Sequence, residues 1–352
     1  MRRLDLWSAE GEHADPTVQP IAAVDLGTNN CRLLVARPEG EGFVVIDSFS
    51  RIVRLGEGLE ATNTLAEPAI QRAIGALRVC ARVMARHAVA QARCVATEAC
   101  RRATNAADFV ERARLASGLT LEVLDHEEEA RLALLGCLAL ADRAFDQFLM
   151  MDVGGGSTEL AWIGRGSGRG HEIVSLSLPL GVVTLAERFG ADPDDAGYLA
   201  MQAAVWNALD AHPATKRLTA HLAADRLQAI GTSGTVTTLA AMHLHLPRYD
   251  RRLVDGIWLP PDAIPGTAVR LRALDTAARA LHPCIGPGRA DLVVAGCAVV
   301  EALHARFPFK ALRVADRGLR EGILATLIGD RLDSALTRHL QPMQRPFEQV
   351  RP

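Results

Sequence analysis

Lysine is almost missing from this sequence: Lys216 and Lys310 are the only two, although lysine and arginine together number 39. The formal net charge is only −2. A chain so close to neutrality has no overall basic field that would attract nucleic acid or an anionic membrane, and we expect neither as a partner. A polyanionic substrate would need cations gathered at one place. Arginine, which binds phosphate through two N–H groups at once, suits that role.

Long apolar runs and cysteine pairs are also lacking. No run approaches the roughly 18 residues that span a bilayer, and the polar, acidic stretch 1–20 does not have the apolar segment of a signal peptide. The seven cysteines are widely spaced, odd in number and without a Cys-x-x-Cys pair. This pattern favours buried, reduced thiols over a disulfide framework or a metal site. Together these absences predict a cytoplasmic protein.

The composition is that of a soluble globular protein, with 49% hydrophobic and 23% charged residues over 352 positions. This length suffices for two lobes, each with a full core. Strands alternate with helices along the chain, which is typical of an α/β sheet. We expect flexible tails at 1–19 and 334–352, an N-terminal lobe at 20–147, a C-terminal lobe at 148–312, and a strand and helix at 313–333 that pack back on the first lobe.

An apolar strand that begins at Phe148 ends in a carboxylate, Asp152, and a glycine-rich turn. The residues that follow and could bind an anion are Gly154, Gly155, Gly156, Ser157 and Thr158. Glycines lack Cβ atoms, so they can turn successive N–H groups toward one point and form a concave anion site. The serine and threonine add hydroxyl donors, and Asp152 lies where it could hold a cation beside the anion. The chemistry indicated is phosphate plus metal.

The same design occurs earlier in the chain. The apolar strand 21–25 ends at Asp25 and is followed by Gly27, Thr28 and Asn29. One Asp-x-Gly sequence alone is often an ordinary hairpin turn. Two copies with the same order of residues indicate two related halves that face one phosphate cleft.

A third strand-to-helix turn carries Gly231 and Ser233. Hydroxyl groups at a helix N-terminus also favour an anion, so this turn is a further candidate for phosphate binding. Later in the chain, apolar periodicity predicts one continuous helix over 267–281 and a last helix over 318–332.

Three consecutive glutamates at 127–129 occupy the first turn of a helix that Asp125 would cap. Acidic residues favour helix N-termini because of the helix dipole. A competing interpretation is that one glutamate is the base that activates a water molecule. Arg101 likewise is either a salt-bridged surface residue or a cation beside the cleft. Glu159 is either a strand-surface residue or a metal ligand.

These motifs, in this order, resemble the exopolyphosphatase/guanosine pentaphosphate phosphatase family. The resemblance runs from about Ile21 to Asp330 and implies an α/β, two-lobed actin–Hsp70–sugar kinase-like (ribonuclease H-like) fold with a central interdomain cleft. Besides the stretches above, it rests on Ala96-Thr97 with Arg101 and Asn105, Glu128-Glu129-Ala130-Arg131-Leu132, Leu180-Gly181, and Asp316-Arg317-Gly318-Leu319-Arg320-Glu321-Gly322.

By this resemblance Glu128, the first glutamate of the Glu-Glu-Ala-Arg-Leu segment, corresponds to the family's catalytic base. Asp25, Asp152 and Glu159 correspond to acidic residues that hold Mg²⁺, the one cofactor expected. The phosphate-binding residues implied are Gly27, Thr28, Asn29, Arg32, Arg101, Gly154, Gly155, Gly156, Ser157, Thr158, Gly231 and Ser233.

The chain departs from the family's pattern at Asn30, Glu98 and Cys100, where members often carry serine, a small polar residue and leucine. An acidic side chain at position 98 would weaken the binding of long polyanions unless it faces away from their path. Longer members also carry a C-terminal helical domain, which we expect to be absent here because the chain ends soon after Asp330. Short or terminal phosphate substrates are therefore expected.

The function expected is Mg²⁺-dependent release of the terminal phosphate from inorganic polyphosphate, with a glutamate activating the water. Guanosine pentaphosphate, converted to ppGpp, is the alternative substrate within the family. A function of another class is a non-catalytic sensor that binds (p)ppGpp. A sugar or acetate kinase fits less well, because the Glu-Glu-Ala-Arg segment suits water activation. A homodimer is expected only by analogy with the family.

Overall fold

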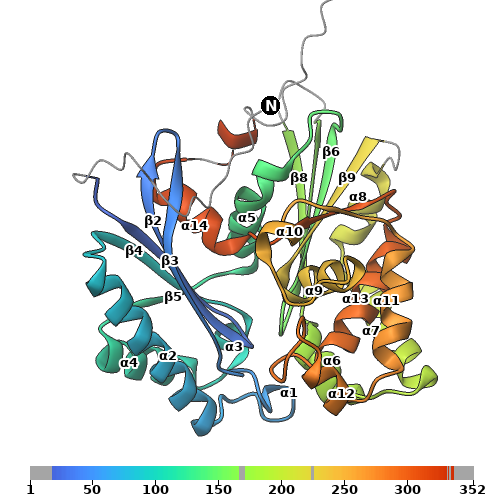
Figure 1. Cartoon of the computed structure of the whole chain (residues 1–352), viewed down its shortest axis with the longest axis horizontal. Helices are drawn as coiled ribbons and strands as arrows, with labels where there is room; N and C mark the ends of the chain where they lie inside the picture. The colour runs from blue at the N-terminus through green and yellow to red at the C-terminus, as the bar shows by residue number, and fades with distance from the viewer. Residues whose placement is uncertain (1–17, 166–170, 223–225, 331, 333, 337–352) are drawn as a thin grey trace, which may run out of the picture.

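Two mixed β-sheets lie on either side of a pair of helices, and further helices cover the outer faces of the sheets (Figure 1). The computed structural model describes residues 18–165, 171–222, 226–330, 332 and 334–336. The two-lobed α/β architecture predicted from the sequence is confirmed.

The first sheet has the strand order β3-β2-β1-β4-β5. The strands are β1 (Ile21–Leu26), β2 (Asn30–Glu39), β3 (Gly42–Ile52), β4 (Gln91–Ala96) and β5 (Leu121–Val123). The first three form an antiparallel meander, and β4 pairs with β1 in parallel, which brings the carboxyl ends of β1 and β4 side by side. The helices of this lobe are α1 (Leu59–Thr62), α2 (Glu67–Arg86), α3 (Glu98–Arg102) and α4 (Ala106–Ser117).

The second sheet repeats this plan in the order β10-β11-β9-β6-β7-β8. Its meander is β6 (Gln147–Val153), β7 (Thr158–Arg165) and β8 (His171–Leu178); β9 (Leu227–Thr232) runs parallel to β6, and β11 (Leu312–Ala315) and β10 (Trp258–Leu259) complete the sheet. The helices of this lobe are α6 (Val182–Phe189), α7 (Asp195–Ala211), α8 (Ala214–His221), α9 (Ser233–His243), α10 (Arg251–Val254), α11 (Ala263–Arg272), α12 (Thr276–Leu281) and α13 (Val293–Arg306).

Between the sheets lie α5 (His126–Cys137) and α14 (Leu319–Leu327), with their apolar residues buried against both sheets (Figure 1). The two helices touch backbone to backbone. A Cβ atom added at Gly136 would lie 2.0 Å from the carbonyl oxygen of Gly318, and one added at Gly322 would lie 1.9 Å from that of Leu132. Only glycine permits this approach, so these two positions set the distance between the helices.

Several local predictions are corrected. The predicted helix 267–281 is two helices, α11 and α12, because Asp275 accepts a hydrogen bond from the backbone N of Ala278 and starts a new helix. The last helix ends at Leu327, before Gly329 with its φ of +86°. Within 313–333, β11 belongs to the second sheet and only the helix contacts β1 of the first. The predicted tails lie almost wholly outside the described residues.

Side chains also join the two lobes where α1 approaches α6 (Figure 1). Arg54 donates two hydrogen bonds to Asp291, at 2.7 and 3.0 Å. Glu60 accepts from Nε of Arg188 at 2.7 Å. These contacts bridge residues more than a hundred positions apart, so they hold the lobes together at this end of the cleft.

All seven cysteines are buried and free, as predicted. Among the described residues, no helix combines the length and the apolar character that crossing a bilayer would require.

The glycine contact between α5 and α14 yields a stability prediction. Gly136→Ala should lower the free energy of unfolding by about 1–3 kcal/mol or more, because the added methyl group overlaps backbone atoms that cannot move aside. Gly75→Ala is the matched control: Gly75 lies inside α2 with open space around its Cβ position, and alanine there should stabilise by about 0.5–1 kcal/mol. Urea denaturation measures both changes, and equal effects of the two variants would contradict the contact.

Candidate active site

A cavity of about 420 Å³ opens between the lobes, and both lobes line it. The turns after β1 and β6 contribute from opposite sides, and so do the first turns of α5, α9 and α14. Several helix N-termini thus reach the cavity, and the unpaired N–H groups of a helix N-terminus favour negative charge.

The two predicted phosphate loops face each other across this cavity. Residues 27–29 line it from the first lobe and residues 154–157 from the second. A Cβ atom at Gly156 would lie 2.7 Å from Oγ1 of Thr28, and one at Gly155 would lie 3.3 Å from the backbone N of Asn29. The glycines are therefore required for the close approach of the loops, and the structure brings together most of the predicted set.

Six carboxylates line the same cavity: Asp316 just before α14, Glu321 within it, and a group of four, Asp25, Glu129, Asp152 and Glu159. Burial and the neighbouring Asp25 raise the pKa of Asp152 to about 6. Burial raises the pKa of Glu129 to about 7; Arg101 opposes this rise, and Asp152 and Asp25 add to it. Burial, with Glu129 and Asp152 nearby, holds the pKa of Glu159 well above its usual range. The cavity therefore concentrates buried carboxyl groups that repel one another when ionised.

Three arginines, Arg32, Arg289 and Arg320, also line the cavity, and within the described chain none of them forms an ion pair. Arg289 donates only to neutral oxygens, those of Thr238 at 3.1 Å and Gly234 at 3.4 Å. Burial and then Arg32 lower the pKa of Arg289, and burial lowers that of Arg320. Cations held together without ion pairs of their own favour an anionic ligand, and a phosphate chain carries the charge to satisfy them.

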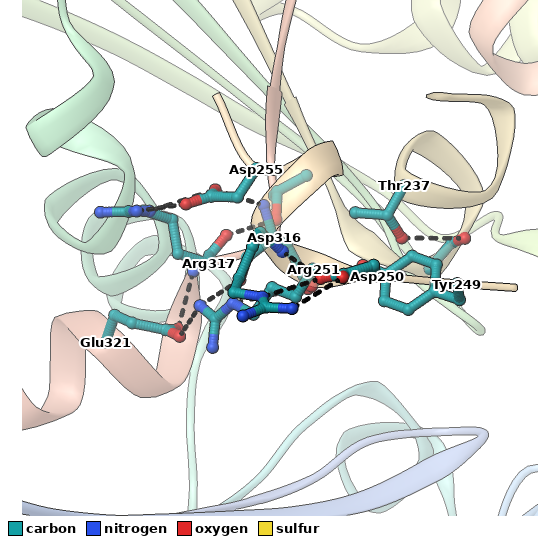
Figure 2. A network of polar contacts seen from close by, with 12 residues as sticks. Thr237, Tyr249, Asp250, Arg251, Asp255, Asp316, Arg317 and Glu321 are labelled. Atoms are coloured by element: carbon teal, nitrogen blue, oxygen red, sulfur yellow. Dashed lines mark hydrogen bonds and ion pairs between the residues drawn. The ribbon is translucent and has the colours of Figure 1, made fainter. Parts of the chain in front are cut away.

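A network of polar contacts fixes the crossing from β11 to α14, residues 316–318 (Figure 2). Arg320 follows in the first turn of α14 and lines the cavity. Arg251 donates to the carbonyl oxygen of Asp316 at 2.5 Å and to Glu321 at 3.1 Å. Asp255 accepts from the backbone N of Asp316 at 2.9 Å, and Glu321 accepts from the backbone N of Gly318, also at 2.9 Å. The backbone of this crossing is thus held by Arg251 and Asp255 of the second lobe and by Glu321 of α14 itself.

Comparison with known proteins decides the family. A model of the Ppx/GppA phosphatase family matches residues 34–330. Exopolyphosphatase 2 of Mycobacterium tuberculosis is 32% identical to this chain over 326 residues, which cover 88% of the chain and 98% of that protein. The chain belongs to the Ppx/GppA phosphatase family. Because this is a family of phosphatases, the protein is a hydrolase.

Solved structures of the Ppx/GppA family have the same fold. The Aquifex aeolicus family member is 28% identical with a TM-score of 0.71, and the match covers 88% of this chain and 98% of that one. An exopolyphosphatase from Cytophaga hutchinsonii is 26% identical with a TM-score of 0.79, covering 90% and 100%. The resemblance drawn from the motifs is confirmed, and with it the actin–Hsp70–sugar kinase-like fold.

Within this Ppx/GppA site, Glu128 does not line the cavity. Its carboxylate accepts hydrogen bonds from Arg131 at 2.6 and 2.9 Å and from Arg93 at 3.1 Å. The contact with Arg131 lowers the pKa of Glu128. Glu129, one residue later, is the member of the trio that reaches the cavity. Consecutive helical residues point about 100° apart, which is why Glu129 lines the cavity and Glu128 does not.

Three other predicted phosphate ligands lie outside the cavity. The hydroxyl of Thr158 donates to the carbonyl oxygen of Leu180 at 2.8 Å. Gly231 lies inside β9, where a Cβ atom would meet the side chains of Leu312 and Val236 at 3.0 Å. Arg101 pairs with Glu98 and Glu129 instead of facing the cavity. The first two are packing positions, and Arg101 acts on a neighbouring carboxylate.

The predicted metal ligands fit a hard cation such as Mg²⁺. Among the described residues no three His, Cys, Asp or Glu side chains are placed to hold an ion by themselves. Mg²⁺, however, usually takes one or two carboxylates and completes its shell with water and substrate phosphate. Asp25 and Asp152 are partly buried and have raised pKa values, and Oδ1 of Asn29 in the same cavity is buried without a hydrogen-bond partner. Arg32 and Arg320 lower the pKa of Asp25 without offsetting its burial, so such an ion would supply further positive charge to these oxygens.

Buried Asp152 gives a pH-dependent prediction. Its pKa is raised from 3.8 to about 6, so protonation favours the folded state; this contribution to stability is present at low pH and is lost as pH rises through about 6. Asparagine stays neutral. With EDTA present, Asp152→Asn should therefore gain on the order of 3 kcal/mol of unfolding free energy over the unchanged protein between about pH 4 and pH 8.

The control for this prediction is Asp210→Asn, because the Asp210 side chain is 70% exposed. Thermal unfolding followed by circular dichroism across this pH range measures both variants. If the stability difference between Asp152→Asn and the unchanged protein does not vary with pH, the pKa of Asp152 is not raised in the folded protein.

Proposed function

We propose that this protein is an exopolyphosphatase, which hydrolyses the terminal phosphate from inorganic polyphosphate. Family membership supports this, as do the names of relatives in Mycobacterium tuberculosis and Cytophaga hutchinsonii. The observation that carries the proposal is the content of the cavity. A buried carboxylate with a pKa of about 7 lines the same cavity as two glycine loops and three arginines that form no ion pair among the described residues.

The terminal phosphate binds between the two loops. Backbone N–H groups of residues 28–29 and 155–157 supply neutral donors there, and Ser157 adds a hydroxyl group. Arg32, Arg289 and Arg320 balance the charge of the following phosphates. This arrangement stabilises charge without forming a covalent phosphoenzyme, as positioning and electrostatics suffice for phosphoryl transfer.

Asp25 and Asp152 would hold Mg²⁺ together with oxygens of the substrate, and the ion would supply positive charge where the phosphates converge. Glu159, which accepts a hydrogen bond from Ser177 at 3.0 Å, lies on the same side of the cavity and adds a third acidic group close to this pair.

Glu129 is the base in this proposal. Its carboxylate takes a proton from a water molecule as the water oxygen bonds to the terminal phosphorus, and the bond from that phosphorus to the bridging oxygen breaks. The products are inorganic phosphate and a chain shorter by one phosphate. A base works best with a pKa near the operating pH, and burial brings Glu129 to about 7.

Phosphate release from polyphosphate and, in parallel, from guanosine pentaphosphate tests the function, each with Mg²⁺ and with EDTA. We expect release from polyphosphate that EDTA abolishes. Faster release from guanosine pentaphosphate would make the nucleotide the main substrate. Tight binding of (p)ppGpp without release from either compound would replace the enzyme with a nucleotide sensor.

Two neighbouring variants test the base. Glu129→Gln should lower kcat for polyphosphate by on the order of 100-fold or more, because the amide cannot take a proton from water. Glu128→Gln makes the same chemical change on the same helix, outside the cavity, and should leave kcat within about threefold of the unchanged protein. The opposite order of effects would return the role to Glu128.

A further inference from the structure

Glu98, the residue at which the chain departs from its family's pattern, is buried at the start of α3, and only 4% of its side chain is exposed. It lies against the glycine loop of the second lobe, since a Cβ atom at Gly156 would come within 3.0 Å of Cγ of Glu98. Despite this proximity the Glu98 carboxylate does not line the cavity. It faces Arg101.

Arg101 connects Glu98 to the proposed base. Its Nε and Nη2 donate to Oε2 of Glu98 at 3.1 and 2.9 Å. Its Nη1 donates to the carbonyl oxygen of Leu124 at 2.9 Å and to Oε2 of Glu129 at 2.5 Å. Four hydrogen bonds leave at most one of the five N–H groups of the guanidinium unused. Arg101 is therefore not available to bind a phosphate unless it leaves both carboxylates.

The three groups lie in a confined space. The Arg101 side chain is 12% exposed and the Glu129 side chain 10% exposed. His126 approaches Glu98 from α5, with Nε2 at 4.0 Å from Oε2. In such a site a guanidinium with two carboxylate partners is held in one orientation, because its planar fork fits one partner on each edge. Loss of either partner would let it rotate.

We propose that Glu98 is a positioning residue for catalysis: through Arg101 it holds the Glu129 carboxylate in the orientation that faces the cavity. This inference rests on the proposed function, in which Glu129 is the base. It also explains how an acidic residue so close to a polyanion site is tolerated, since its carboxylate forms an ion pair with Arg101 and does not face the substrate.

Two substitutions of Glu98 separate the position of its oxygen atoms from its charge. Glu98→Asp keeps the charge but shortens the side chain, so its carboxylate no longer reaches both Nε and Nη2 of Arg101. It should lower kcat for polyphosphate about tenfold or more while KM changes less than about threefold, because a displacement of about 1 Å in a catalytic group can cost up to 100-fold. Glu98→Gln, made separately, keeps the length and one oxygen acceptor, so its kcat should stay within about fivefold of that of the unchanged protein.

The matched control is Glu111→Asp. Glu111 pairs with Arg114 at the same i,i+3 spacing, but on the exposed surface of α4, so kcat and KM should not change. A further readout is a double variant: in the Glu129→Gln background, Glu98→Asp should have little additional effect on kcat, because the group that it positions is already disabled.

The results distinguish the two proposals. If the unchanged protein releases phosphate from polyphosphate but Glu98→Asp keeps the full kcat, the positioning role is overturned and the function is kept. It is also overturned if KM rises as much as kcat falls, which would make Arg101 a substrate ligand, or if Glu98→Asp and Glu129→Gln lower kcat additively. No phosphate release by the unchanged protein overturns both. Thermal unfolding of each variant verifies that it is folded.

Discussion

The contact between the backbones of α5 and α14 is the constraint on which the site depends. Two helices that meet through glycine lie closer than side chains would allow, and both sheets pack against this close pair. Glu129 lies in the first turns of one of these helices and Arg320 in the first turn of the other. Their distance apart is therefore set by helix packing and not by the loops, which makes the proposed base and a proposed phosphate-binding cation parts of one rigid unit.

Around this unit the protein keeps charge out of water. Arginines that form no ion pair among the described residues line the same cavity as carboxyl groups with raised pKa values, and neither set neutralises the other completely. Such an arrangement costs stability in the free protein, because desolvated like charges repel one another. The cost is recovered when an anion and a cation enter together. The arginines thus favour an anionic ligand and the carboxyl groups a cationic one.

Much of the fold could be read from the sequence, since both Asp-x-Gly turns follow strands with unmistakable apolar runs. The site was harder for physical reasons. Helix α5 lies between two sheets and is apolar on almost every side, so periodicity does not reveal which glutamate faces the cavity. Strand alternation, by contrast, contained the answer for Thr158: its neighbours Ser157 and Glu159 line the cavity, and side chains alternate along a strand. Arg289 comes from a distant loop that carried no recognisable signal.

The ion pairs between the lobes have a consequence for solution conditions. The pair between Arg54 and Asp291 is partly exposed, so dissolved salt, with a Debye length of about 8 Å at physiological strength, screens it substantially. The arginines inside the cavity are partly buried within the protein and are screened less. Rising ionic strength therefore loosens the junction between the lobes more than it weakens the attraction for a phosphate chain within. The separation of the two lobes at the entrance of the cavity therefore depends in part on ionic strength.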